Sequence, residues 1–178
     1  IRSMNRPSLK QAIASLAAQS YPNIEVLVVN ASGAAHPLPA HPPHRLAVRV
    51  VDPVVQLGSE AHSDTCQAMP RLGRSAAANQ GLDACNGRYA IFLDDDDHVS
   101  PRHLERLVEA LQSDGQAVAA YSGVRVEGAN GQWVRDYDMP WEPRRLRGVN
   151  YLPIHAVLFR LHSVRVAGAC FDVNLPVF

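Results

Sequence analysis

The chain has no excess charge of either sign, because its 17 Lys and Arg residues balance its 17 Asp and Glu residues. Proteins that bind nucleic acids or anionic membrane surfaces usually carry a clear positive charge, so we expect no nucleic-acid partner. Long apolar runs are also lacking. No segment has the length of a membrane span, and no signal-peptide pattern opens the chain. These absences exclude a membrane-spanning segment in this sequence.

Cysteines are few and widely separated. The chain has three, Cys66, Cys85 and Cys170, and no Cys-x-x-Cys pair. This spacing argues against a structural zinc site. An odd number of dispersed cysteines is typical of a reducing compartment rather than of a disulfide scaffold, so a cytoplasmic location is expected.

Segments with helical and strand-like patterns alternate along the chain. The composition, 47% hydrophobic and 19% charged over 178 residues, is that of one ordinary globular domain. Apolar residues recur at helical spacing over 9–17, 75–84 and 104–111, and short apolar runs typical of buried strands cover 25–29, 46–51, 89–93, 117–121 and 156–159. This alternation predicts an α/β fold with a mostly parallel central sheet flanked by helices.

Turn residues indicate where several elements end. Gly128-Ala129-Asn130-Gly131 separates two strand-like segments and predicts an antiparallel hairpin at one edge of the sheet. Asn86-Gly87 predicts the end of the second helix, and Ser100-Pro101 predicts the start of the third. The segments over 35–44, rich in Pro and His, and over 52–71 are predicted to be loops.

Four consecutive aspartates, Asp94 to Asp97, follow the strand predicted over 89–93. Ligands of open α/β sheets bind beyond the carboxyl ends of the strands. Adjacent carboxylates repel one another unless a cation or solvent relieves them, and Mg²⁺ or Mn²⁺ prefers carboxylate and phosphate oxygens. One interpretation is a metal or phosphate site in which Asp94 and Asp96 face one ligand, as alternate residues of an extended segment do. The other is a solvated acidic turn that caps the next helix.

A third class of protein, the aspartate-nucleophile phosphatases, has a similar motif after an apolar strand. Aspartate-nucleophile phosphatases carry Asp-x-Asp there, but on the first strand and with Thr or Val two residues after the second Asp. In this chain two strands come earlier, and His98 follows Asp96 by two residues. The pattern therefore disfavours a phosphatase.

A family resemblance is carried by six segments in a fixed order: Asn5 to Pro7, Ser15 to Val26, Arg74 to Leu82, Gly87 to Asp97, Pro153 to Arg160 and Gly168 to Asp172. Together they resemble the family-2 glycosyltransferases of the GT-A fold. The ordered set, which spans nearly the whole chain, is far more specific than any one piece. The resemblance implies a single glycosyltransferase domain over 1–178, cut at both ends, with a nucleotide-sugar-binding half over 1–100 and an acceptor-side half over 101–178.

The resemblance also implies a reaction. A nucleotide-diphosphate sugar, UDP- or dTDP-linked, would give its sugar with inversion to a saccharide or lipid-linked acceptor, as in polysaccharide or cell-wall biosynthesis. A lipid-linked acceptor would bring this cytoplasmic protein to the inner face of the membrane. Mn²⁺ or Mg²⁺ would stabilise the leaving diphosphate. By position, Asp96 would bind this cation, with Asp94 and Asp97 as further ligands.

Five residues are implied on the donor side by the same correspondence: Asn30, Arg74, Asn79, Asp94 and Asp95. Strand 25–29 ends in Asn30-Ala31, where the family usually has two aspartates that read the base. Asn both donates and accepts hydrogen bonds, so it can still read a uracil or thymine edge. Arg74 can pair with phosphate or stack on a base, and its alternative is an ordinary surface charge.

The acceptor side has two candidates, His155 and Trp133. A structural histidine and simple edge packing are the respective alternatives. The family's general base belongs to a Glu-Asp pair that we expect beyond Phe178, so no catalytic base is assigned; Asp172 is predicted to cap a loop. Two other functions stay open at this point: a non-catalytic nucleotide-binding domain of the same fold, and a nucleotidyltransferase.

Overall fold

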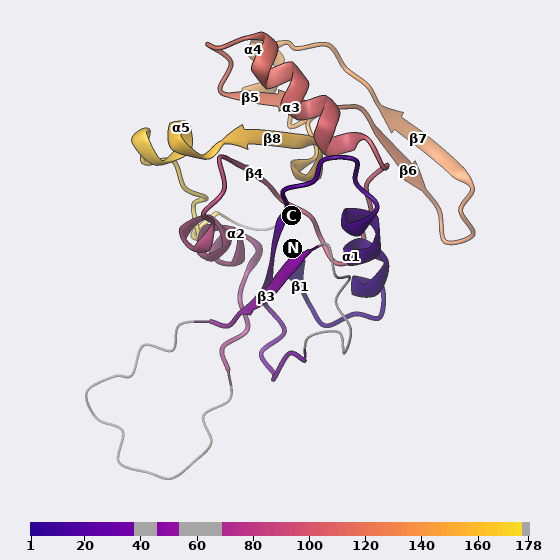
Figure 1. Ribbon diagram of the computed structural model, residues 1–178, viewed down its shortest axis with the longest axis vertical. Helices are drawn as coiled ribbons and strands as arrows, with labels where there is room; N and C mark the ends of the chain where they lie inside the picture. Colours follow the sequence, from indigo (N-terminus) through magenta and orange to yellow (C-terminus); the bar gives the residue numbers. More distant parts are fainter. Residues whose placement is uncertain (38–45, 54–68, 176–178) are drawn as a thin grey trace.

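Three parallel strands form the first sheet of the computed structural model, which describes residues 1–37, 46–53 and 69–175 (Figure 1). β2 (Glu25–Asn30) lies between β1 (Arg2–Ser3) and β3 (Ala47–Val51). The register places Arg2 opposite Val29, and Val26 opposite Val48. The parallel sheet predicted from the alternating pattern is confirmed here.

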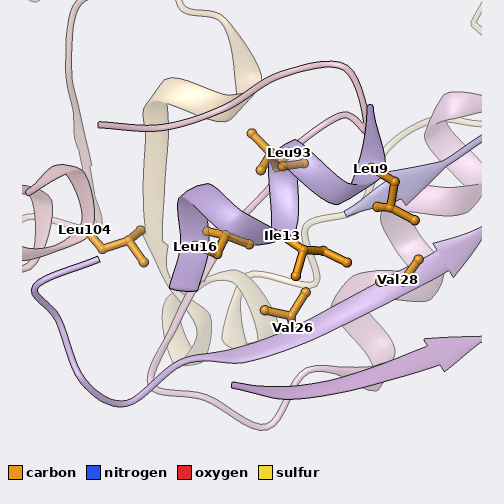
Figure 2. Packing of buried hydrophobic residues seen from close by; sticks show 8 residues of the cluster. Leu9, Ile13, Leu16, Val26, Val28, Leu93 and Leu104 are labelled. Carbon is orange, nitrogen blue, oxygen red and sulfur yellow. The ribbon is translucent and has the colours of Figure 1, made fainter. Parts of the chain in front are cut away.

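Helices cover both faces of β2. Val26 and Val28 pack in one core cluster with α1 (Leu9–Ala17), while Val29 packs on the other face against Ala77 of α2 (Arg74–Ala84). A strand buried on both faces has a continuous apolar run rather than an alternating one, as this segment does. Figure 2 shows the labelled α1 side chains that pack on β2: Leu9, Ile13 and Leu16.

A second sheet has β8 (Val157–Arg160) at its centre, antiparallel to both β4 (Tyr89–Ile91) and β5 (Ala119–Tyr121). The two sheets meet just past β4, where the backbone N–H of Arg2 donates to the carbonyl of Leu93 at 3.0 Å. α3 (His103–Ser113) covers this second sheet with its predicted apolar face: Leu104, Leu107, Val108 and Leu111. The acidic cluster therefore lies at the junction of the two sheets.

The hairpin of β6 (Val124–Glu127) and β7 (Trp133–Tyr137) is confirmed, with Gly131 in the left-handed region at φ 71°. It forms a separate two-stranded sheet rather than an edge of the central sheet, and it projects at the upper right of Figure 1. The remaining elements are short: α4 (Pro143–Leu146), the 3₁₀ helix η1 (Ile154–Ala156) and α5 (Leu161–Val166). None of the described helices is long and apolar enough to cross a membrane.

α2 ends at Ala84 as predicted, but its predicted cap and the predicted start of α3 are wrong. α2 ends through Cys85 in extended backbone (φ −68°, ψ 140°), so Gly87 is not its cap. α3 begins two residues later than predicted. The carbonyl of Pro101 accepts a hydrogen bond from the backbone N–H of Ser20, and the first i to i+4 hydrogen bond runs from the backbone N–H of Arg106 to the carbonyl of Arg102 at 3.0 Å. Most of the segments predicted as loops over 35–44 and 52–71, with Cys66, lie outside the described residues.

His103, the first residue of α3, gives a testable pH dependence. Its Nε2 is buried without a hydrogen-bond partner among the described residues, and burial lowers the pKa of this imidazole below 6.5. Because the unfolded chain then binds this proton more tightly than the folded one, stability is lost as the pH falls from about 6.5 through the lowered folded pKa. Urea unfolding of His103→Leu at pH 7.5 and 5.5 should show a smaller loss on acidification than the wild type.

The exposed His162 supplies the matched control. His162→Leu should keep the wild-type difference between the two pH values. An equal acid-induced loss in wild type and His103→Leu would show that this buried imidazole does not control the pH dependence.

Candidate functional site

Asp95 turns into the protein, and its side chain is fully buried. Its carboxylate accepts hydrogen bonds from the backbone N–H groups of Met4 (2.7 Å) and Arg6 (3.4 Å), from Ser3 Oγ (3.2 Å) and from Arg6 Nη1 (3.2 Å). Asn5, between these donors, has φ 59°, a left-handed conformation that Asn tolerates well. Asp95 therefore anchors the loop between β1 and α1, a structural contribution that the donor-side assignment did not include.

The other three aspartates converge on one point. Asp94, Asp96 and Asp97 each offer one carboxylate oxygen within 4.8 Å of the other two. The backbone N–H of Asp97 donates to the carbonyl of Asp94 at 3.2 Å, so the segment is a turn rather than the extended strand that the alternation argument assumed. Asp97 consequently lies with the other two instead of facing away. Three carboxylate oxygens this close to one another are the hard donors that Mg²⁺ or Mn²⁺ prefers.

Arginines already approach these carboxylates. Arg2 Nε donates to Asp94 Oδ1 at 3.0 Å, and Arg74 Nη2 lies 4.0 Å from Asp94 Oδ2. Arg6 Nη1 donates to Asp96 Oδ2. Cationic side chains thus relieve the repulsion that four adjacent carboxylates would otherwise suffer.

His155 links the cluster to the acceptor-side half of the chain. Its Nδ1 lies 3.3 Å from Asp97 Oδ2. Burial raises the pKa of the Asp97 carboxyl above its usual value; His155 acts against this rise, and the neighbouring Asp96 adds to it. The structure therefore places the predicted His155 in direct contact with the acidic cluster.

Asn30, predicted to read the base, has its whole amide engaged by the protein. Its Nδ2 donates to the carbonyl of Ala34 and to Asp52 Oδ1, both at 2.8 Å. Its Oδ1 accepts from the backbone N–H (3.1 Å) and Oγ (2.7 Å) of Ser32. These bonds use both donors and both lone pairs of a side-chain amide. The fully buried Asn30 thus organises the loop after β2, and the exposed Asp52 ends the neighbouring strand.

Asn79, also predicted on the donor side, clamps a distant segment. Its amide donates to the carbonyl of Phe171 and accepts from the backbone N–H of Phe171, both at 2.8 Å. The Phe171 ring packs edge-on against Phe92, with centroids 5.3 Å apart. The loop cap predicted at Asp172 is confirmed, since its Oδ1 accepts from the backbone N–H of Asn174 at 2.8 Å.

A cavity of about 820 Å³ opens at the acidic cluster. One end is lined by Arg74, Asp94, Asp97 and His155. Much of the remaining lining is apolar and comes from β2, β4 and α2. The exposed Arg74 guanidinium stands at the N-terminus of α2, on the cluster side of this cavity. The polar end thus brings cationic and anionic side chains together at one place in the lining.

A second cavity, of about 330 Å³, lies between the hairpin and the segment before β8. Arg135 and Tyr137 line it from β7, and Tyr151 and His155 line it from the other side. His155 therefore faces both cavities. Trp133 is 63% exposed and lines neither of these two among the described residues.

The parallel sheet with helices on both faces and the acidic turn at its junction with β4 agree with the GT-A fold that the sequence resemblance implies. The family model described as "Glycosyl transferase family 2" matches residues 68–166, more than half of the chain. The chain belongs to this family.

Relatives and solved structures agree with this assignment. The chain is 26% identical over 161 residues to the O-antigen biosynthesis protein RfbC of Myxococcus xanthus, covering 90% of this chain and 12% of RfbC. It superposes on S. aureus TarS 1-349 with a TM-score of 0.61 at 15% identity, covering 99% of this chain and 50% of TarS 1-349. For TarS 1-349 in complex with UDP-GlcNAc the TM-score is 0.59 at 14% identity, with 96% and 46% covered. At these identities the structural likeness establishes the GT-A fold alone.

Proposed function

We propose that the chain binds a nucleoside-diphosphate sugar together with a divalent cation and transfers the sugar to a saccharide acceptor. The observation that carries this proposal is the convergence of Asp94, Asp96 and Asp97, of which Asp94 and Asp97 line the large cavity together with Arg74. Family membership supports glycosyl transfer. The UDP-GlcNAc complex of TarS supports a UDP-sugar donor, and the RfbC relative supports polysaccharide biosynthesis.

Each side chain of the cluster has a defined task under this proposal. The carboxylates of Asp94, Asp96 and Asp97 would hold Mn²⁺ or Mg²⁺, which supplies positive charge to the leaving diphosphate. Arg74 can pair with a phosphate oxygen, since its guanidinium is 63% exposed and stands on the same side. Arg2 fixes the orientation of Asp94 through its 3.0 Å hydrogen bond.

Other predicted donor-side residues would act by shaping the site. Asn30 fixes the loop after β2, and Asn79 holds Phe171 against α2. His155 stands between the two cavities, so an acceptor entering from the hairpin side would meet it before the donor. Stacking of an acceptor sugar on Trp133 stays a prediction.

Thermal shift with a panel of nucleotides tests the proposal. UDP-, GDP- and dTDP-sugars are compared with and without Mn²⁺, and Mn²⁺ alone is the reference. A ligand present at about 100 times its Kd adds about 2.7 kcal/mol to the stability of the protein that binds it. We expect a UDP-sugar to raise Tm only with the metal. The absence of a shift with any nucleotide at millimolar Mn²⁺ would contradict the proposal.

A further inference from the structure

Arg6 bridges two aspartates, one buried and one exposed. Its Nη1 donates both to Asp95 Oδ1, in a fully buried carboxylate, and to Asp96 Oδ2, whose side chain is 54% exposed. The same nitrogen therefore ties a structural carboxylate to a candidate metal ligand. The Arg6 side chain itself is 43% exposed, so it stands at the surface of the site.

Asp95 fixes the position of Arg6 through both its backbone and its side chain. Its backbone N–H also points at Asp95, in the loop that Asp95 anchors. A buried carboxylate without its cationic partner strongly destabilises the folded protein. The ion pair with Asp95 therefore keeps the Arg6 guanidinium in place. Arg6 is therefore a built-in positive charge beside Asp96 rather than a free surface side chain.

This charge opposes a free divalent cation. An ion bound to Asp96 would lie close to the guanidinium, and two positive charges at short range repel. Arg2 and Arg74 stand against Asp94 in the same way, so arginines already offset much of the negative charge of the cluster. A diphosphate changes this balance, because its oxygens complete the coordination of the cation and can also pair with the arginines.

We propose that Arg6 is a positioning residue that couples cation binding to donor binding: it holds Asp96 while the donor is absent and lowers the affinity for free cation. The inference deepens the proposed function and rests on it, since both concern the same cluster. By linkage, the donor strengthens cation binding by the same factor as the cation strengthens donor binding.

Titration with Mn²⁺, followed by electron paramagnetic resonance, tests Arg6→Met without nucleotide and with UDP. Met removes the charge and keeps much of the length. Free Mn²⁺ should bind the variant up to about fivefold more tightly than the wild type, the effect of removing a charge interaction of ordinary surface strength. The tightening by UDP should shrink by a similar factor. Arg6→Lys keeps a positive charge and should keep the weak free-cation binding.

A control variant separates this effect from a general loss of positive charge. Arg125→Met removes an exposed arginine that is paired with Asp136 on the hairpin, and it should leave Mn²⁺ binding unchanged. If Arg6→Met does not fold, the double variant Arg6→Met/Asp95→Asn removes the buried charge along with its partner and is titrated instead. A purely structural Arg6 would lower Tm and leave the affinity for free Mn²⁺ unchanged.

The outcomes also separate this inference from the proposed function. If wild type binds UDP with Mn²⁺ but Arg6→Met binds free Mn²⁺ no more tightly, the coupling role of Arg6 is wrong and the proposed function stands. If wild type binds no nucleotide with metal, the proposed function itself is wrong.

Discussion

Asp96→Ala is expected to remove metal-dependent donor binding and to lower sugar transfer by at least about a hundredfold, the usual effect of losing one preorganised group that stabilises developing charge. The variant removes one of the three carboxylates that converge within 4.8 Å. Its side chain is 54% exposed and is paired with Arg6 at the surface. An exposed pair contributes at most about 1 kcal/mol, so the fold should survive.

The measurement is the Tm shift produced by UDP-sugar with Mn²⁺, followed by the rate of transfer. Asp136→Ala is the matched control, because Asp136 is also a half-exposed aspartate paired with an arginine, Arg125, but lies on the hairpin. It should keep the metal-dependent shift. A shift of equal size in wild type and Asp96→Ala would remove Asp96 from the metal site.

Much of the fold follows from local patterns. β2 was predictable because a strand covered on both faces must be apolar throughout, and α3 because its buried positions recur at helical spacing. The direction of β8 was not predictable, since it is antiparallel to its neighbours and short apolar runs have the same pattern in either direction. The hairpin was predicted as such, but its separation from the central sheet depends on tertiary packing.

The candidate site also has a part that the sequence predicts and a part that it does not. The position of the aspartates at the end of β4 could be predicted from a buried strand that runs into an acidic segment. Their partners could not, because Arg2 is 92 positions from Asp94 and Arg6 is 90 positions from Asp96. Asn30 was predicted to bind the base from its place at a strand end, whereas its hydrogen bonds within the loop become visible only in the folded chain.

Asp95→Ala is the second variant with a large expected effect, a loss of about 3 kcal/mol in the free energy of unfolding. The fully buried carboxylate accepts hydrogen bonds from Ser3, Met4 and Arg6, and alanine leaves these donors without an acceptor. Urea unfolding measures the loss. Asp83→Ala, on the exposed side of α2, is the control and should change stability by less than about 0.5 kcal/mol.

The alanine variants of the two neighbouring aspartates should therefore lose different properties. Asp96→Ala should keep its stability and lose the metal, because Asp96 faces solvent. Asp95→Ala should lose stability first, because the loop that carries Arg6 is no longer anchored. Asp95→Asn, which retains one acceptor oxygen, should recover part of the stability. Equal unfolding midpoints for Asp95→Ala and Asp83→Ala would show that the loop between β1 and α1 does not depend on this carboxylate.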